Sequence, residues 1–126
     1  MKKIILVFFL LIKPSLIFAE DYNLKELISL KSPWGSTFIN KEELLITEKS
    51  GKIKLINLKN KNIKTIDHNL NVLEYGQGGL LDILFKDNIV WVSYTENRGN
   101  YKTSTSIARG NFNRGKIEFK NIFQAY

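Results

Sequence analysis

The chain has 126 residues, no cysteine and a formal net charge of +7 at neutral pH. Without cysteine, neither a disulfide framework nor a thiolate metal site is possible. The basic residues are mostly lysines spread along the chain rather than arginines clustered with aromatic residues, so the composition gives no indication of nucleic-acid binding.

The first 19 residues have the three parts of a secretion signal. Lys2 and Lys3 form a basic start, residues 4–12 are an unbroken apolar run, and Ala19 precedes a plausible cleavage point. The run is too short to span a membrane stably, since a spanning helix needs about 20 apolar residues. We therefore predict a signal peptide over 1–19 and a periplasmic or secreted mature chain; an uncleaved N-terminal anchor is the alternative. Cleavage would remove three lysines and no acid, leaving a net charge of +4.

Residues 20–30 form a short amphipathic or extended lead-in segment. After it come short apolar runs of β type, separated by turn-prone residues. Around Ile53 and Leu55 the apolar residues alternate with lysines, which is the period of a half-buried strand. This pattern predicts a first set of four strands, over residues 34–39, 44–47, 53–56 and 63–66.

A second set of four strands is predicted over residues 80–85, 89–95, 104–112 and 117–123. The two sets are weakly similar, because the pairs Thr47-Glu48 and Thr95-Glu96 stand 48 residues apart. That spacing is close to the length of one propeller blade, about 40–50 residues. The predicted fold class is all-β, with residues 31–126 forming about two four-stranded blades of a β-propeller. A stand-alone β-sandwich of eight strands is the alternative.

Two blades cannot close a propeller. Each blade buries its faces against its neighbours, and closed propellers have about four to eight blades. The strand pattern therefore indicates roughly the first third of a larger domain, whose remaining blades are the expected partner.

A glycine-rich loop, Gly76-Gln77-Gly78-Gly79, precedes the first strand of the second set. Its glycines let the backbone take positive φ or approach a ligand closely, and Gln77 offers an amide donor and acceptor. Because the ends of inner strands surround the channel of a propeller, such a loop faces the usual ligand site. A glycine-rich turn between blades that binds nothing is the alternative, since short glycine motifs occur often.

Three motifs together point to a known family. Leu80-Leu81-Asp82 follows the glycine loop in register, Pro33-Trp34-Gly35 lies upstream, and residues 91–96 lie downstream. With them the chain resembles the quinoprotein glucose/sorbosone dehydrogenase family over residues 30–124. The resemblance implies a six-bladed β-propeller that oxidises aldose sugars at C1 to lactones in the periplasm, with pyrroloquinoline quinone (PQQ) and Ca²⁺ as cofactors.

The same resemblance assigns roles within the site. It implies that Gln77, flanked by Gly76 and Gly78, contacts the PQQ cofactor. The histidine general base, the arginines that hold the quinone carboxylates and the calcium ligands would lie beyond Tyr126, so we expect this chain alone to be inactive. Two rival functions stay open: a non-enzymatic binding propeller, as in members of the wider family that serve in protein recognition, and a truncated product without function.

Other polar and aromatic residues are expected to be structural. His68 is the only histidine and is predicted to be a solvated loop residue, and a single histidine provides no paired-histidine metal site. Trp34 is predicted to be a core or blade-interface aromatic, and Glu48 is predicted to have a structural role. Arg109 either reaches a channel anion or pairs with Glu96 or Glu118; we favour the pairing.

Overall fold

The computed structural model describes residues 22–100 and 102–126, so the predicted signal peptide over 1–19 lies outside the described residues. Residues 22–32 precede the first strand without regular secondary structure except a short bend. Within the described ranges, no helix is long and apolar enough to cross a membrane. The described strands are β1 Pro33–Asn40, β2 Glu43–Glu48, β3 Lys52–Asn57, β4 Ile63–His68, β5 Leu80–Lys86, β6 Ile89–Asn97, β7 Thr103–Asn111, β8 Lys116–Ile117 and β9 Lys120–Gln124.

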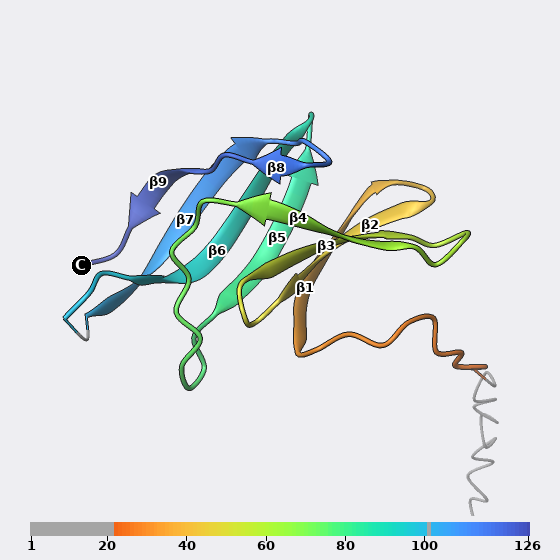
Figure 1. Cartoon of the computed structure of the whole chain (residues 1–126), viewed down its shortest axis with the longest axis horizontal. Coiled ribbons are helices and arrows are strands. Elements are labelled where there is room, and N and C mark those ends of the chain that lie inside the picture. The colour runs from red at the N-terminus through yellow and green to blue at the C-terminus, as the bar shows by residue number, and fades with distance from the viewer. Residues whose placement is uncertain (1–21, 101) are drawn as a thin grey trace, which may run out of the picture.

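The strands form two sheets, which correspond to the two predicted sets (Figure 1). The first sheet has the order β1-β2-β3-β4-β8, and the second has the order β5-β6-β7-β9. Strands β1 to β4 and strands β5 to β7 each pair antiparallel with the next strand in the chain, as two-stranded hairpins do. Both first strands carry a register shift near their start, so the two sheets begin in the same way.

The prediction of one last strand over residues 117–123 is wrong. The chain over 117–123 divides into β8, which pairs in parallel with β4 of the first sheet, and β9, which pairs with β7. The Asn69 side chain explains the division, because its Oδ1 accepts from Phe119 N (2.8 Å) and its Nδ2 donates to Phe119 O (3.0 Å). Both backbone groups of Phe119 are thereby satisfied without a partner strand in the second sheet.

One apolar core lies between the sheets. The first sheet contributes residues such as Leu45, Ile53 and Leu55, and the second contributes residues such as Val92 and Tyr94, which is 2% exposed. Along β6, inward-facing residues are buried and alternate with half-buried ones, which is the two-residue period of a strand with one face in a core. In the described part of the chain, every buried side-chain nitrogen or oxygen has a hydrogen-bond partner.

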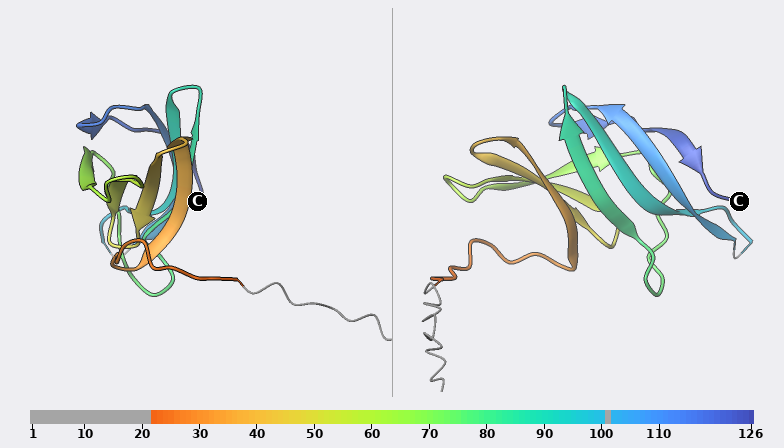
Figure 2. Two further views of the ribbon diagram at one scale, coloured as in Figure 1. Left: turned by 90° about the vertical axis from the view of Figure 1, so that its right-hand side faces the viewer. Right: turned by 180° about the vertical axis from the view of Figure 1, so that it is seen from behind.

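The two sheets meet most closely where β1 and β2 lie against the start of β5 (Figure 2). The buried Thr47 hydroxyl accepts from Gly35 N (2.9 Å) and donates to Leu81 O in the second sheet. A Cβ on Gly35 would lie 2.8 Å from Asp82 Cα, so only glycine allows this approach. The main chain is also joined directly, since Leu80 N donates to Lys49 O (3.1 Å).

Trp34 is 51% exposed, so it is not a core residue of the described chain, and its role as a blade-interface aromatic stays a prediction. The predicted environment of His68 is wrong. His68 ends β4 and is half-buried rather than solvated. Its Nδ1 accepts from Leu70 N (3.2 Å) and its Nε2 lies 2.6 Å from Gly51 O, so both ring nitrogens are used.

The predicted structural role of Glu48 is confirmed, since this buried carboxylate accepts from Lys31 N (3.0 Å).

A bidentate ion pair joins distant parts of the sequence on the surface. Arg114, between β7 and β8, donates to both carboxylate oxygens of Glu43 in β2, at 2.5 and 2.7 Å. The hydrogen bond from Arg114, aided by one from Asn40, lowers the pKa of Glu43 from 4.5 to about 2. The pair therefore fastens the β7–β8 connection to the first sheet.

Replacing Thr47 by valine tests the junction between the sheets. Valine keeps the shape but leaves Gly35 N and Leu81 O without their partner, which costs about 1–3 kcal/mol for buried groups. We expect Thr47→Val to lower the free energy of unfolding by that amount in urea denaturation. Thr103→Val, at the exposed start of β7, is the matched control and should change little. Equal stability of the two variants would contradict the role of Thr47.

Acid titration tests the Arg114–Glu43 pair. Because the folded-state pKa of Glu43 is below its unfolded value, the stabilisation is complete above about pH 4.5 and is lost as the pH falls toward 2. We expect Glu43→Gln to make the unfolding midpoint less dependent on pH in this range. The part of the pH dependence that comes from the other carboxylates should stay unchanged. Identical acid-unfolding curves for the variant and the parent chain would show that the pair does not contribute.

Candidate functional site

The glycine-rich loop forms a tight turn immediately before β5. Gly78 N donates to Tyr75 O (2.8 Å), which closes the turn, and Gly76 adopts a positive φ of 56° that favours glycine. A Cβ on Gly76 would meet no atom within 4 Å, so the space beside this residue is open. The backbone of the loop is thus exposed on one side.

Contacts on the other side hold the loop in place. Lys49, in the turn after β2, donates from Nζ to Gly76 O (2.5 Å), and its carbonyl accepts from Leu80 N. Gly79 N donates to Thr95 Oγ1 (3.2 Å) in β6. A Cβ on Gly79 would lie 2.4 Å from Lys49 O, so glycine is required where the loop crosses this turn. The loop is therefore positioned by both sheets.

Gln77 lies at the tip of this loop and is exposed. No hydrogen bond to its side-chain amide is present within the described ranges, so its donor and its acceptor are available to a ligand. Beside the loop, the Lys49 ammonium group lies 6.0 Å from the centre of the Trp34 ring. The structure therefore brings the predicted residues Gly76, Gln77 and Gly78 together, with Trp34 and Lys49 next to them.

Lys49 is a site residue that the sequence did not indicate. It stands in a Lys-Ser-Gly turn, where a lysine normally extends into solvent, and its contact with Gly76 spans 27 residues. Only the arrangement of the two sheets brings that turn under the loop. No local sequence pattern carries this information.

A polar groove of about 450 Å³ runs from the loop along the edge of the second sheet. Tyr75 and Gly78 line it from the loop, and Thr95 and residues 103–105 line it from β6 and β7. Tyr75 is 82% exposed. The groove thus presents hydroxyl groups and two aromatic rings, those of Tyr75 and Tyr126, on the side of the loop that carries Gln77.

Behind this groove, Glu96 holds the second sheet together. It accepts hydrogen bonds from Ser106 (2.8 Å), Asn121 (2.9 Å) and Gln124 (2.8 Å). Burial raises the pKa of Glu96, but these hydrogen bonds outweigh burial, so the pKa lies below its ordinary value. Burial raises the pKa of the neighbouring Tyr94, whose hydroxyl donates to Asn121. Glu96 is therefore a charged structural residue that fastens β9 to β6 and β7.

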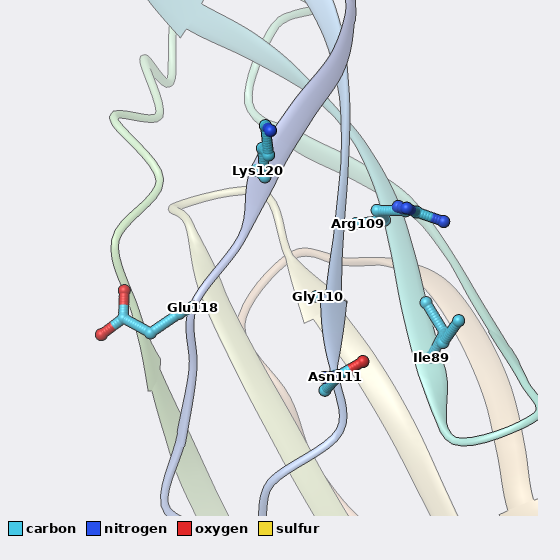
Figure 3. A pocket seen from close by; sticks show the side chains of 6 residues that line it. All are labelled: Ile89, Arg109, Gly110, Asn111, Glu118 and Lys120. Carbon is cyan, nitrogen blue, oxygen red and sulfur yellow. The ribbon is translucent and has the colours of Figure 1, made fainter.

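The predicted pairing of Arg109 is wrong. Among the ion pairs of the described chain, Glu96 pairs with Arg98 and Glu118 pairs with Lys116. Figure 3 shows the Arg109 side chain pointing away from Glu118. Among the described residues, no ion pair includes Arg109, although Glu118 lines the same pocket.

Arg109 instead lines an open pocket of about 250 Å³ with Ile89, Glu118 and Lys120 (Figure 3). Ile89 begins β6, whereas the glycine-rich loop lies beside the other end of this strand. The pocket is therefore at the opposite end of the sheet and does not belong to the candidate site.

Comparison with known proteins identifies similar structures. A sequence profile of the Glucose / Sorbosone dehydrogenase family matches residues 30–126. A solved glucose dehydrogenase is 31% identical, with a TM-score of 0.70 over 75% of this chain and 32% of its own. The soluble aldose sugar dehydrogenase of Escherichia coli, in the apo form, is 25% identical, with a TM-score of 0.67 over 75% of this chain and 30% of its own. No curated protein matches the chain.

A third structure carries the cofactor. It is the PQQ-bound aldose sugar dehydrogenase of Streptomyces coelicolor, 20% identical, with a TM-score of 0.67 over 77% of this chain and 31% of that chain. The chain thus spans less than a third of the length of each of these proteins. The two sheets are blades of a β-propeller, as predicted, and the alternative of a stand-alone sandwich is wrong.

Substituting two glycines of the loop tests how the loop is held. Gly79→Ala would drive Cβ into the Lys49 carbonyl, and overpacking of this kind costs about 1–3 kcal/mol. Gly76→Ala is the matched control, because its Cβ enters open space and only the positive φ opposes it. We expect Gly79→Ala to lower the free energy of unfolding by more than the control. The opposite order would contradict the described loop anchor.

Proposed function

The chain belongs to the glucose/sorbosone dehydrogenase family, and we propose that it forms the first two blades of a PQQ-dependent aldose sugar dehydrogenase. The whole protein would oxidise an aldose sugar at C1 to a lactone in the periplasm, to which the predicted signal peptide would direct it. The exposed amide of Gln77, on a loop fixed by both sheets, is the observation that supports this proposal most strongly.

The loop fits part of a PQQ site. PQQ carries carboxylate and quinone oxygens, which accept hydrogen bonds, and the Gln77 side chain offers two N–H donors with no competing partner in the described chain. Open space beside Gly76 lets a flat ligand approach the backbone. When bound, the quinone supplies the hydride acceptor. The role of this chain is to orient one side of that ligand through Gln77, with Gly76 and Gly78 shaping the loop.

The described residues supply no free histidine to act as general base for the reaction. His68 is the only histidine in the sequence, and both of its ring nitrogens already contact backbone groups. The described ranges also contain no group of three or more acidic, histidine or cysteine residues that could hold a metal ion. In our proposal, further blades supply the base and the metal ligands.

The absence of a free histidine in the described chain equally suits the second candidate, a binding propeller without catalysis. In that case the Gln77 loop and its polar groove would bind a ligand without oxidising it. Quinone titration and dye reduction together separate the two candidates.

Quinone titration of purified chains tests the role of Gln77. A hydrogen bond to a charged group contributes about 1.5–3 kcal/mol, so Gln77→Ala should weaken PQQ binding by about ten- to a hundredfold. The quinone absorbance is the readout. Asn23→Ala, in the exposed segment before β1, is the matched amide control and should bind like the parent chain. Unchanged affinity of Gln77→Ala would remove Gln77 from the site.

Dye reduction tests the division of labour between this chain and further blades. With PQQ, Ca²⁺ and glucose present, we expect the purified chain to reduce no electron-accepting dye, because both ring nitrogens of its one histidine already contact backbone groups and cannot take the sugar hydroxyl proton. Quinone-dependent reduction above the protein-free background would contradict that expectation. It would also reject the binding propeller as the function of this chain.

A further inference from the structure

The peptide unit between Gly76 and Gln77 lies at the centre of the turn in the glycine-rich loop. The hydrogen bond from Gly78 N to Tyr75 O (2.8 Å) closes this turn, so Gly76 and Gln77 are its two central residues. Of these two, only Gly76 has a positive φ, 56°, which is the pattern of a type II′ turn. The central peptide unit takes no part in the closing bond. Its carbonyl and its N–H can therefore both bond outside the turn.

Lys49 binds the carbonyl of this peptide unit. Its Nζ donates to Gly76 O (2.5 Å) from the turn after β2. The Lys49 backbone is itself fixed on both sides, because its N–H donates to Ser32 O (3.0 Å) and its carbonyl accepts from Leu80 N (3.1 Å). The ammonium group also lies 6.0 Å from the centre of the Trp34 ring, the distance of a cation–π contact. A fixed cation thus holds the Gly76 carbonyl from one side of the loop.

The direction of this carbonyl determines where the N–H of the same peptide unit points. In a planar trans peptide the C=O and N–H bonds point in opposite directions, and the described chain contains no cis peptide bond. Because Gly76 O points toward Lys49, the Gln77 N–H points away from it. Within the described ranges this N–H has no hydrogen-bond acceptor. It is therefore a directed donor that the described chain leaves without a partner.

The turn opposes a reversal of this peptide unit. A rotation that exchanged the carbonyl and the N–H would require a positive φ at Gln77, which a residue with a Cβ disfavours. The same rotation would break the hydrogen bond between Gly76 O and the Lys49 ammonium group. Both costs keep the Gln77 N–H on the side of the loop opposite Lys49.

Lys49 also strengthens the donor whose direction it sets. A hydrogen bond to the carbonyl oxygen draws electron density from the nitrogen of the same peptide unit through amide resonance, and hydrogen bonds linked in this way polarise one another. A charged donor such as the Lys49 ammonium group does so more strongly than a neutral one. The effect of the charge reaches the Gln77 N–H through a single peptide unit.

We propose that the backbone N–H of Gln77 is a second donor to the bound ligand, directed and polarised by Lys49. One residue then offers a backbone donor and a side-chain amide to oxygens of the same ligand. The partner of the N–H is a carboxylate or quinone oxygen of a flat anionic ligand, since such oxygens accept from amide groups. The inference rests on the proposed function and deepens it, because it makes Lys49 a positioning residue that acts through the backbone.

Quinone titration of Lys49→Met in two backgrounds tests the proposal. Methionine nearly keeps the length of the lysine side chain and retains the backbone hydrogen bonds, but it removes the charge. We expect Lys49→Met to bind PQQ about three- to tenfold more weakly than the parent chain, as for the loss of one hydrogen bond. Gln77→Ala retains the backbone N–H, so Lys49→Met should weaken binding by the same factor in that background. Lys49→Arg keeps a cation and should recover part of the affinity.

Lys52→Met is the matched control, because it removes the same charge from an exposed lysine at the start of β3 and should bind like the parent chain. Unchanged affinity of Lys49→Met would overturn the proposal, as would an effect of this variant that disappears when Gln77 is alanine. Either result beside a weakened Gln77→Ala would leave the proposed function standing. A parent chain that binds no PQQ would reject the proposed function and this inference together.

The amide resonance of Gln77 provides a second readout, which a merely stabilising role of Lys49 would not move. PQQ should shift this proton downfield in the parent chain as the hydrogen bond forms, and Lys49→Met should shift it upfield in the ligand-free chain. Gly78 N, which already donates to Tyr75 O, is the internal reference and should move little. A Gln77 resonance that stays in place when the parent chain binds PQQ would overturn the proposal, even if Lys49→Met folds poorly.

Discussion

The rest of the structure depends on the close contact between the first sheet and the start of β5. Gly35 and Gly79 remove the side chains that would keep the backbones apart, and Lys49 O and Thr47 Oγ1 then bond to Leu80 N and Leu81 O. Both groups lie at or near the core, so leaving them unpaired would cost free energy. This contact fixes the angle between the sheets, and with it the core and the loop before β5.

The position of the candidate site follows from that contact. The glycine-rich loop continues directly into Leu80, so the bonds that hold β5 also hold the loop. Lys49 serves twice, because its carbonyl binds the strand and its ammonium group binds Gly76 O. The Gln77 amide is consequently presented from a rigid base although it lies at an exposed turn, and a rigid base favours ligand binding because little conformational freedom is lost.

Much of this fold could be predicted from short-range patterns. The alternation in β3 and β6 and the glycine and asparagine turns locate the strands, and the repeated Thr-Glu pair indicates two similar sheets. The division of the last strand could not be predicted, because it depends on Asn69 replacing a strand partner for Phe119 across 50 residues. For the same reason the roles of Lys49 and His68 were not seen, since each comes from a contact made only after the sheets associate. The cofactor role of Gln77 stays a prediction.

The close contact between the first sheet and the start of β5 joins the two sheets into one unit. Amide hydrogen exchange at Leu80 tests this account most directly, because this N–H bridges the sheets outside any strand pairing. The account predicts exchange as slow as at the amides of β6 in the core, since opening this bond requires the sheets to separate. Exchange as fast as in the segment before β1 would show that the two sheets are not joined at this point, and would contradict the account.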